Sequence, residues 1–576
     1  MTRRGRTVVA LVAAAAALAL PAAAWAHAAL LRTVPSASGT VNRPPGQVAL
    51  TFSEPVEPRF AVVSVTDAAG HQETAGPPRR SPADADTITV PVRRIGQGWY
   101  LVYWRVISVD GHPVRGAFTF AVGPSPGPPP QFVVPSLSES AATPGLVTAK
   151  FVAFVAFMSA VGLFCLRILI ARPLVRRVRD TELRSLSIAF FAACALALLA
   201  IPFYALLTTA EFAQRKVTEL GALAPLLRVS AYGRAYLDLE LVFALFALAG
   251  AIAIWVDRPQ REHRSLAELL SVIGALAAGA AVCSIPAVGG HAGQTSPRGW
   301  AILFDWAHVA SGAIWIGGLI GLLVLWRSLP VARRVAGLVV CVPRFSNVAF
   351  VSVNTLIAAG IGSSILHLPT LASLWQTSFG KTLVVKVLLV GLALQLAAVN
   401  LLRTKPRLAA SGARPELGPP TALLLRRLVA GEIDIVAAAI FAASVLSSLP
   451  PPPKALAEAG KAVARVGPGR VSKAVTRNGY RIQFEAAPNR AAVPNDFALR
   501  LTRSGKPVRG ADVTAKFAML DMEMQQQAYH LPETSPGVYT RSAPALVMVG
   551  HWGISFDVQP PGKPSFTVLW VDRAGG

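Results

Sequence analysis

Phe151-Val-Ala-Phe-Val-Ala-Phe-Met-Ser-Ala-Val-Gly-Leu-Phe164 decides the fold, because it lies in an apolar stretch, residues 146–170, that is long enough to cross a bilayer. Seven further stretches of this kind follow it, at residues 184–208, 235–256, 266–287, 300–326, 346–367, 380–402 and 428–449. The chain of 576 residues is 53% hydrophobic and 15% charged, a balance typical of membrane proteins. The sequence therefore predicts an eight-helix transmembrane bundle over residues 146–450.

Basic residues are concentrated in alternate loops of this unit. The loops after the first, third, fifth and seventh spans contain Arg172, Arg176, Arg177 and Arg179; Arg258, Arg261 and Arg264; Arg327, Arg333, Arg334 and Arg344; and Arg403, Lys405, Arg407, Arg414, Arg426 and Arg427. Basic loops remain in the cytoplasm, so both ends of the bundle are expected outside. The loop at residues 209–234 is also basic and fits this rule least well. Because these loops explain much of the net charge of +25, we expect a lipid bilayer and no nucleic acid as partner.

Residues 1–26 have the features of a secretory signal peptide. Arg3, Arg4 and Arg6 precede an apolar run, and Ala24-Trp-Ala26 is a small-residue cleavage site. An uncleaved anchor helix is the alternative. Cleavage after Ala26 makes His27 the first residue of the mature chain.

Two segments of short, β-rich runs flank the membrane unit. Residues 27–123 predict a β-sandwich or Greek-key barrel, and residues 478–576 predict a second β-sandwich. The linkers at residues 124–145 and 451–477 are rich in Pro, Gly, Ser, Ala or Lys. None of the four cysteines lies in these two segments, so we expect no disulfide framework. The fold class is thus a multi-domain membrane protein.

The first candidate metal site consists of His27, Asp110 and His112. The α-amine and imidazole of an amino-terminal histidine form a chelate with the nitrogen ligands that Cu(II) prefers. Asp110 and His112 are two residues apart, so on an extended backbone their side chains leave from one face. An Asp-Gly-His-Pro sequence is also typical of a simple turn.

A second candidate group lies in and beside the membrane spans. His291, Asp305, His308 and His367 are all expected near the outer surface and could hand copper inward. The alternative is that these groups only form hydrogen bonds between helices or in loops. Lys386, Glu432 and Asp434 also lie within spans, and we interpret them as internal ion pairs.

A third candidate site is a methionine cluster in the last segment. Met519, Met522 and Met524 are three of the six methionines in the chain, and His530 follows them. Thioether sulfur is a soft ligand that selects Cu(I). The alternative is an ordinary set of core methionines.

The first segment resembles the CopC family of small secreted copper-binding β-barrels. The resemblance rests on His27-Ala-Ala-Leu30, Pro45-Gly-Gln-Val-Ala-Leu-Thr-Phe-Ser-Glu-Pro-Val56, Gly98-Trp-Tyr-Leu-Val-Tyr-Trp-Arg-Val106 and Ser108-Val-Asp-Gly-His-Pro-Val-Arg-Gly-Ala-Phe-Thr-Phe120. It implies that His27, Asp110 and His112 are the Cu(II) ligands. No methionine occurs between Met1 and Met158, so the segment departs from members that carry a Met-rich Cu(I) site.

The other two segments also resemble known families. Trp306-Ala-His308, Ile314-Trp-Ile-Gly-Gly318, Gly380-Lys-Thr-Leu-Val-Val-Lys386 and Asn400 are similar to the CopD family of polytopic copper proteins. Met519, Pro536-Gly-Val-Tyr539 and Val549-Gly-His-Trp552 give a weaker similarity to YtkA or FixH-like β-sandwiches. CopC-like and CopD-like parts are known to occur fused in one chain.

These observations predict copper import at the cell membrane, with both β domains outside the cytoplasm. The copper ion, the bilayer and extracytoplasmic copper chaperones are the expected partners. Copper resistance by export and a copper-sensing scaffold are the alternatives. A copper oxidase with an amino-terminal histidine brace is disfavoured, because Asp110 stands where such enzymes keep a position open for oxygen. We therefore expect no enzyme activity.

Overall fold

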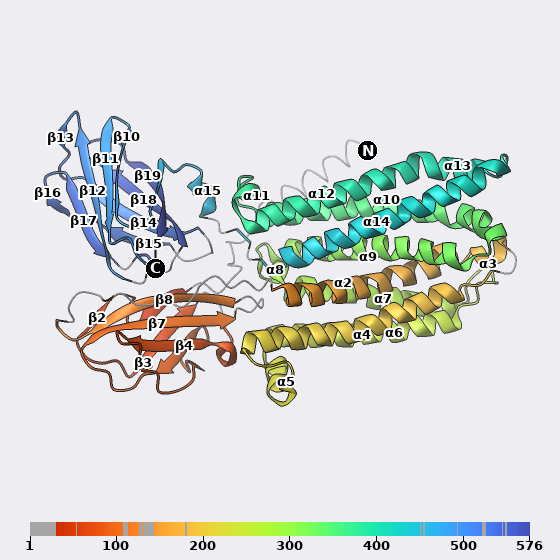
Figure 1. Ribbon diagram of the computed structural model, residues 1–576, viewed down its shortest axis with the longest axis horizontal. Coiled ribbons are helices and arrows are strands. Elements are labelled where there is room, and N and C mark those ends of the chain that lie inside the picture. Colours follow the sequence, from red (N-terminus) through yellow and green to blue (C-terminus); the bar gives the residue numbers. More distant parts are fainter. Residues whose placement is uncertain are drawn as a thin grey trace.

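Two β domains lie at one end of a long bundle of helices (Figure 1). The computed structural model describes residues 30–575 apart from residues 38, 53–54, 108–112, 126–129, 131–142, 179–180, 450, 453–454, 492, 521–525, 544 and 548–549. The predicted signal peptide lies outside the described residues.

The first domain is a sandwich of two four-stranded sheets. One sheet has the order β1 (Leu30–Val34), β3 (Gln47–Phe52), β6 (Thr87–Pro91) and β5 (Arg79–Arg80). The other has the order β2 (Thr40–Val41), β8 (Pro113–Val122), β7 (Gly98–Ile107) and β4 (Val62–Asp67). Alternate residues of β3 are buried, as expected for a strand with one face on the core. Phe52 meets Trp104 of the other sheet edge to face, with ring centroids 5.4 Å apart.

The membrane unit contains eight helices that are long and apolar enough to cross a bilayer, within the described residues. They are built from α2 (Pro144–Cys165), α4 (Arg184–Ala213), α6 (Ala231–Val256), α7 (Leu266–Gly289), α9 (Arg298–Ser328), α10 (Val331–His367), α12 (Ser378–Val399) and α14 (Gly418–Leu446). The predicted eight-helix bundle is confirmed.

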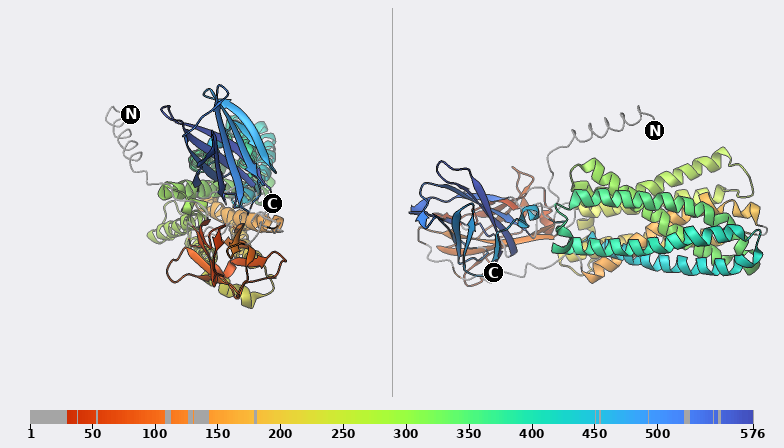
Figure 2. Two further views of the ribbon diagram at one scale, coloured as in Figure 1. Left: turned by 90° about the vertical axis from the view of Figure 1, so that its left-hand side faces the viewer. Right: turned by 90° about the horizontal axis from the view of Figure 1, so that it is seen from above.

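Short elements connect or extend these helices. They are η1 (Pro58–Phe60) in the first domain, the π-helical turns η2 (Leu166–Ala171) and η3 (Asn400–Thr404), α3 (Leu174–Arg177), α5 (Leu220–Val229), α8 (His291–Gln294), α11 (Ser373–Gln376), α13 (Lys405–Ala410), η4 (Pro415–Leu417) and α15 (Leu456–Ala459). α8 and α11 lie at the end of the bundle that faces the β domains, whereas α3 and α13 lie at the opposite end (Figures 1 and 2). The arginine-rich turns and the β domains are thus at opposite ends.

The last domain is a sandwich of a six-stranded and a five-stranded sheet. The first sheet has the order β10 (Val471–Arg477), β11 (Tyr480–Ala487), β12 (Asn495–Arg503), β17 (Val538–Ala543) and β16 (Glu533–Ser535), with β13 (Lys506–Pro507) paired to β12. The second has the order β15 (Gln527–His530), β14 (Asp512–Met519), β18 (Gly550–Gln559), β19 (Phe566–Ala574) and β9 (Ala464–Val466). This confirms the predicted fold class of the segment.

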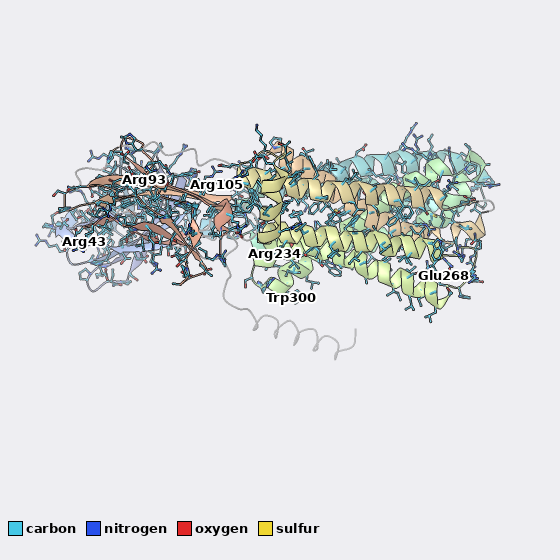
Figure 3. The ribbon with its side chains drawn as sticks, turned by 90° about the horizontal axis from the view of Figure 1, so that it is seen from below. Arg43, Arg93, Arg105, Arg234, Glu268 and Trp300 are labelled. Carbon is cyan, nitrogen blue, oxygen red and sulfur yellow. The ribbon has the colours of Figure 1, made fainter. Side chains whose placement is uncertain are left out.

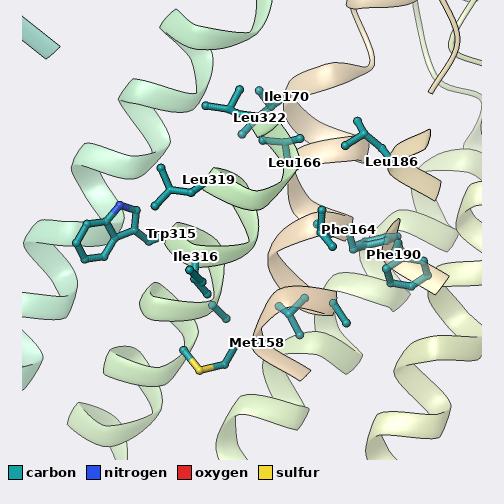
Figure 4. Close-up of a cluster of buried hydrophobic side chains, with 14 of the residues drawn as sticks. Met158, Phe164, Leu166, Ile170, Leu186, Phe190, Trp315, Ile316, Leu319 and Leu322 are labelled. Atoms are coloured by element: carbon teal, nitrogen blue, oxygen red, sulfur yellow. The ribbon is translucent and has the colours of Figure 1, made fainter. Parts of the chain in front are cut away.

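Helix α2 is the centre of the bundle and packs closely on α9. A Cβ atom on Gly162 would collide with the carbonyl oxygen of Ala313, and Gly317 lies at the same crossing. Small residues of this kind allow membrane helices to approach each other closely. Phe164 and Phe190 fill the space on the other side of α2, and the Trp315 indole lies away from them (Figure 4). Trp315 therefore faces a different group of helices.

A buried ionic network lies at the end of the bundle away from the β domains. The Asp257 carboxylate accepts from Arg167 at 2.9 Å and from Arg172 at 3.1 Å. Glu268 accepts from the backbone N–H groups of Arg258 and Ser265 at 2.6 and 2.7 Å, and it is labelled at this end in Figure 3. The network ties α2 and η2 to the connection between α6 and α7.

Candidate metal centre

The predicted Cu(II) ligands His27, Asp110 and His112 lie outside the described residues. The structure does place the strand ends that flank two of them. Ile107, the last residue of β7, is paired with Pro113, the first residue of β8. Ile107 is also buried, at 2% exposure, in a small apolar cluster that joins the first domain to the bundle.

This cluster docks the first domain on the ends of α4 and α6 that face the β domains. Phe60 and Ile107 of the domain pack with Phe212 of α4 and Tyr232 of α6. The Arg105 guanidinium donates from Nη1 to the carbonyl oxygen of Phe212 at 3.0 Å, and this contact is buried. Figure 3 shows Arg105 at the side of the domain that meets the helices. The chain that carries Asp110 and His112 therefore leaves and re-enters the domain beside the membrane unit.

His308 is held between three helices of the bundle. It lies on α9, where Nδ1 is 3.0 Å from the carbonyl oxygen of Leu356 on α10, and Nε2 is 3.2 Å from Nζ of Lys386 on α12. A carbonyl oxygen only accepts, so Nδ1 carries the proton and the Nε2 lone pair accepts from the lysine ammonium. Gly360 makes room for the ring, because a Cβ atom there would be 3.3 Å from it.

Asp305 and His308 both interact with the charge of Lys386. It lies one turn earlier on α9, and Lys386 and His367 are the main charges that act on its carboxylate. Its carboxylate is not within ion-pair distance of Lys386 among the described contacts. The lysine is therefore shared: it donates to the His308 imidazole and is attracted by the Asp305 carboxylate.

His367 and His291 are joined through Thr295 at the end of the bundle that faces the β domains. His367 Nδ1 is 2.7 Å from the Ser363 carbonyl oxygen, and its Nε2 is 3.2 Å from the Thr295 hydroxyl. That hydroxyl donates to the backbone carbonyl oxygen of His291 at 2.8 Å. The structure thus brings Asp305, His308 and His367 into one region, with His291 connected to it through its backbone.

No three His, Cys, Asp or Glu side chains come together as a metal site within the described part of the chain. The membrane group is a series of single donors rather than a preformed cage. Lys386 is the member that sequence reasoning missed, because a lysine in an apolar span was interpreted as one half of an ion pair.

The ion-pair interpretation of the three charged span residues is wrong in the described structure. Lys386 donates to His308, and Glu432 accepts from the Trp315 indole at 2.8 Å and from the Asn400 amide at 3.5 Å. Asp434 is exposed on α14. Hydrogen bonds between helices replace the expected charge pairs.

The predicted Cu(I) cluster is only partly described. Met522 and Met524 lie outside the described residues, and Met519 is buried at the end of β14, opposite Trp552. His530 pairs with Thr514, five residues from Met519 and roughly 16 Å along the strand, and its Nδ1 is 3.1 Å from Asp512. The structure does not bring His530 beside Met519. His551 is closer, because its carbonyl oxygen accepts from the N–H of Leu520 at 2.8 Å.

A buried carboxyl, Asp572, lies on β19 of the same domain. Its Oδ1 accepts from the Asn489 amide at 2.9 Å, whereas Oδ2 is buried without a hydrogen bond from another described residue. Burial raises the pKa of Asp572 to about 6, partly offset by the bond from Asn489. The folded domain therefore binds this proton more tightly than the unfolded chain does.

The last domain is accordingly expected to lose stability as the pH rises through about 6. The contribution is fully present below the ordinary pKa of an aspartate and amounts to roughly 3 kcal/mol for a shift of about two units. Replacing Asp572 with asparagine, which stays neutral, should flatten the profile. Thermal unfolding of the full chain, followed by tryptophan fluorescence at several pH values, measures this. An Asp572→Asn variant with the same pH profile as the native chain contradicts the assignment.

Three families match the chain in the predicted order. The CopC domain matches residues 30–123, copper resistance protein D matches residues 339–446, and the YtkA-like family matches residues 474–557. Copper transport protein CutJ of Bacillus subtilis is 26% identical over 548 residues, which cover 93% of this chain and 93% of that protein.

Single-domain relatives match the first domain. Copper resistance protein C of Xanthomonas campestris pv. juglandis is 31% identical over 126 residues, which cover 20% of this chain and 96% of that protein. The crystal structure of CopC from Methylosinus trichosporium OB3b is 29% identical, covers 19% of this chain and 99% of that one, and has a TM-score of 0.16. The chain therefore belongs to the CopC and CopD families of copper resistance and transport proteins, with a YtkA-like domain after the membrane unit.

Proposed function

We propose that this protein imports copper: the first domain captures Cu(II) outside the cell membrane, and the membrane unit passes copper inward. The observation that carries the proposal is the His308–Lys386 contact, a histidine in a membrane span at 3.2 Å from a lysine, with Asp305 nearby. Ionisable groups at this depth are costly, and they are retained where they serve a function. The group lies in the outer part of α9, the side of the bundle on which the copper-binding domain docks.

Copper and the Lys386 ammonium compete for the same atom of His308. In the described state the Nε2 lone pair accepts from Lys386, so a metal ion can bind there only after the ammonium has moved. The Asp305 carboxylate attracts that ammonium and offers it an alternative position. Arrival of a cation at His308 repels Lys386, which then neutralises Asp305. Lys386 stays in the group beside Asp305, so the net charge of the group rises by the charge of the bound ion.

The two β domains fit different oxidation states of copper. The amine, imidazoles and carboxylate of His27, His112 and Asp110 suit Cu(II). The thioethers of Met519, Met522 and Met524 suit Cu(I). Of the two nearby histidines, His551 is nearer to Met519 than His530 is. Copper that reaches the last domain as Cu(I) would be held there by these thioethers. The arginine-rich turns lie at the other end of the bundle, which supports a position of both β domains outside the cytoplasm.

Replacing His308 with alanine is expected to lower copper uptake by roughly tenfold or more, because a ligand of the path is lost rather than one of its supporting groups. Cu(II) binding by the first domain should not change. Copper accumulation by cells that produce the variant as the sole copper transporter measures the effect. The matched control is His263→Ala, which removes an exposed histidine from the connection between α6 and α7.

The same comparison separates the alternative functions. A scaffold that senses copper predicts that His308→Ala leaves cell copper unchanged. A protein that exports copper predicts that the variant raises cell copper. Either result contradicts the import proposal.

A further inference from the structure

Glu432 lies at the centre of the membrane unit, away from the histidines. It is 2% exposed and stands fourteen residues from both ends of α14, which runs from Gly418 to Leu446. Trp315, its partner on α9, is seven residues beyond His308, which is two helical turns on the same face and about 10 Å further from the β domains. Glu432 and Trp315 therefore form a second buried polar group in the bundle, further from the β domains than the group of His308 and Lys386.

Two donors reach the carboxylate, and two buried oxygens of the neighbouring turn η3 remain unsatisfied among the described residues. Trp315 Nε1 donates to Oε1 at 2.8 Å, and Asn400 Nδ2 is 3.5 Å from Oε2. Asn400 Oδ1 and the Thr404 hydroxyl are buried without a hydrogen bond to the described residues. Both belong to the π-helical turn η3, and such turns occur frequently at functional sites. The unsatisfied oxygens thus leave acceptor positions for a bound proton or cation near Glu432.

No charged side chain on the packed elements comes within ion-pair distance of Glu432 in the described part of the chain. The titratable groups on these elements are Lys150, Cys165 and Arg167 on α2 and η2; Arg298, Asp305, His308 and Arg327 on α9; Arg333, Arg334, Cys341, Arg344 and His367 on α10; Lys381 and Lys386 on α12; Arg403 on η3; Lys405 and Arg407 on α13; Glu416 on η4; and Arg426, Arg427 and Asp434 on α14 itself. A buried carboxylate without a counter-charge costs several kcal/mol, so a positive species is needed to neutralise it.

The chemistry of the group selects a proton. Copper(I) prefers sulfur or imidazole, and this group offers only oxygens. A metal cation needs a shell of about six oxygens, whereas here the indole N–H already occupies Oε1. A proton needs only one carboxylate oxygen and one acceptor. The Asn400 amide can supply that acceptor by turning its Oδ1 toward the new O–H group, and the two amide orientations fit the two states of the acid.

We propose that Glu432, positioned by Trp315 and Asn400, is a proton-exchange site of the membrane unit. In the uptake step a hydronium ion gives its proton to Oε2, so an O–H bond forms, one water is released and the carboxylate becomes a neutral acid. The reverse step returns the proton to water. Coupling of this proton to copper movement rests on the import function proposed above, whereas the proton site itself does not.

Infrared difference spectroscopy of the purified full-length chain, free of copper and reconstituted in lipid nanodiscs, tests the site. Acidification should produce a carbonyl stretching band of a buried carboxylic acid. The Glu432→Gln variant should lose that band, and the matched control Asp434→Asn, two residues along α14 and exposed, should keep it. Trp315→Phe removes a donor and should shift the band in frequency without abolishing it.

Three results overturn the proposal. The first is a Glu432→Gln spectrum identical to that of the native chain, with the variant shown to be folded by Cu(II) binding to its first domain. The second is an identical loss of the band in Asp434→Asn. The third is a band that responds to sodium or potassium at fixed pH but not to pH, which assigns an alkali cation instead. Because no copper is present, failure of copper transport in other experiments leaves this test unaffected.

Discussion

One extra residue before His27 is expected to weaken Cu(II) binding by about 100-fold or more, which corresponds to roughly 2.8 kcal/mol. The proposed site uses the α-amine and the imidazole of His27 as a chelate, together with Asp110 and His112. An added residue converts that amine into an amide, which is a poor ligand, while all side chains remain. Titration of Cu(II) into the purified mature chain and into the chain extended by one glycine measures the difference.

A second histidine of the same domain supplies the control. His71 is exposed and its Nδ1 is 3.0 Å from Asp67 Oδ2 in a turn. Replacing it with alanine should leave the Cu(II) affinity unchanged. Equal affinity of the native and extended chains shows that the amine is not a ligand and removes the chelate from the account.

Replacing Asp257 with alanine is expected to destabilise the membrane unit by about 3–5 kcal/mol. Asp257 is 6% exposed, and its two oxygens accept from Arg167 and Arg172, which are themselves buried. Among the described residues, the substitution leaves the buried Arg167 guanidinium without a charge partner, and it leaves Arg172 only Glu268, whose Oε1 is 4.0 Å from Nη2 of Arg172. This penalty exceeds the loss of the hydrogen bonds themselves. Thermal or denaturant-induced unfolding of the detergent-solubilised chain measures the loss.

Glu262 provides a matched comparison at the same end of the bundle. Its side chain is 71% exposed and it lies 3.6 Å from Arg176. Glu262→Ala should cost less than about 1 kcal/mol, because exposed ion pairs contribute little. Similar losses for the two variants contradict the view that burial determines the strength of this network.

The membrane unit and the fold class were predictable because their signals are local. Each span is a continuous apolar run, and its identity does not depend on its neighbours. The alternation of apolar and polar residues along short runs predicted the two β domains in the same way. In β11 (Tyr480–Ala487), for example, every second residue is buried. All four cysteines are buried within the membrane unit.

The hydrogen-bond partners of buried polar residues on distant segments were not predictable, because they depend on how the helices cross. Lys386 and His308 are 78 residues apart, and Trp315 and Glu432 are 117 apart. A charged residue in a span suggests a charged partner, but a histidine lone pair and an indole N–H satisfy these two groups instead. His530 was joined to Met519 by closeness in sequence, whereas the register of β14 and β15 places them apart.

The docking of the first domain also required the structure. Arg105 and Phe212 are 107 residues apart, and no sequence pattern links a strand of one domain to the end of a distant helix. Ile107, in the same apolar cluster, immediately precedes the segment that carries the proposed ligands Asp110 and His112.

The central claim is that copper captured outside moves inward, and the copper content of cells with and without this protein tests it most directly. Under copper limitation, deletion is expected to lower cell copper, and the native chain should restore it whereas His308→Ala should not. Higher copper after deletion would contradict import and assign the protein to export or resistance.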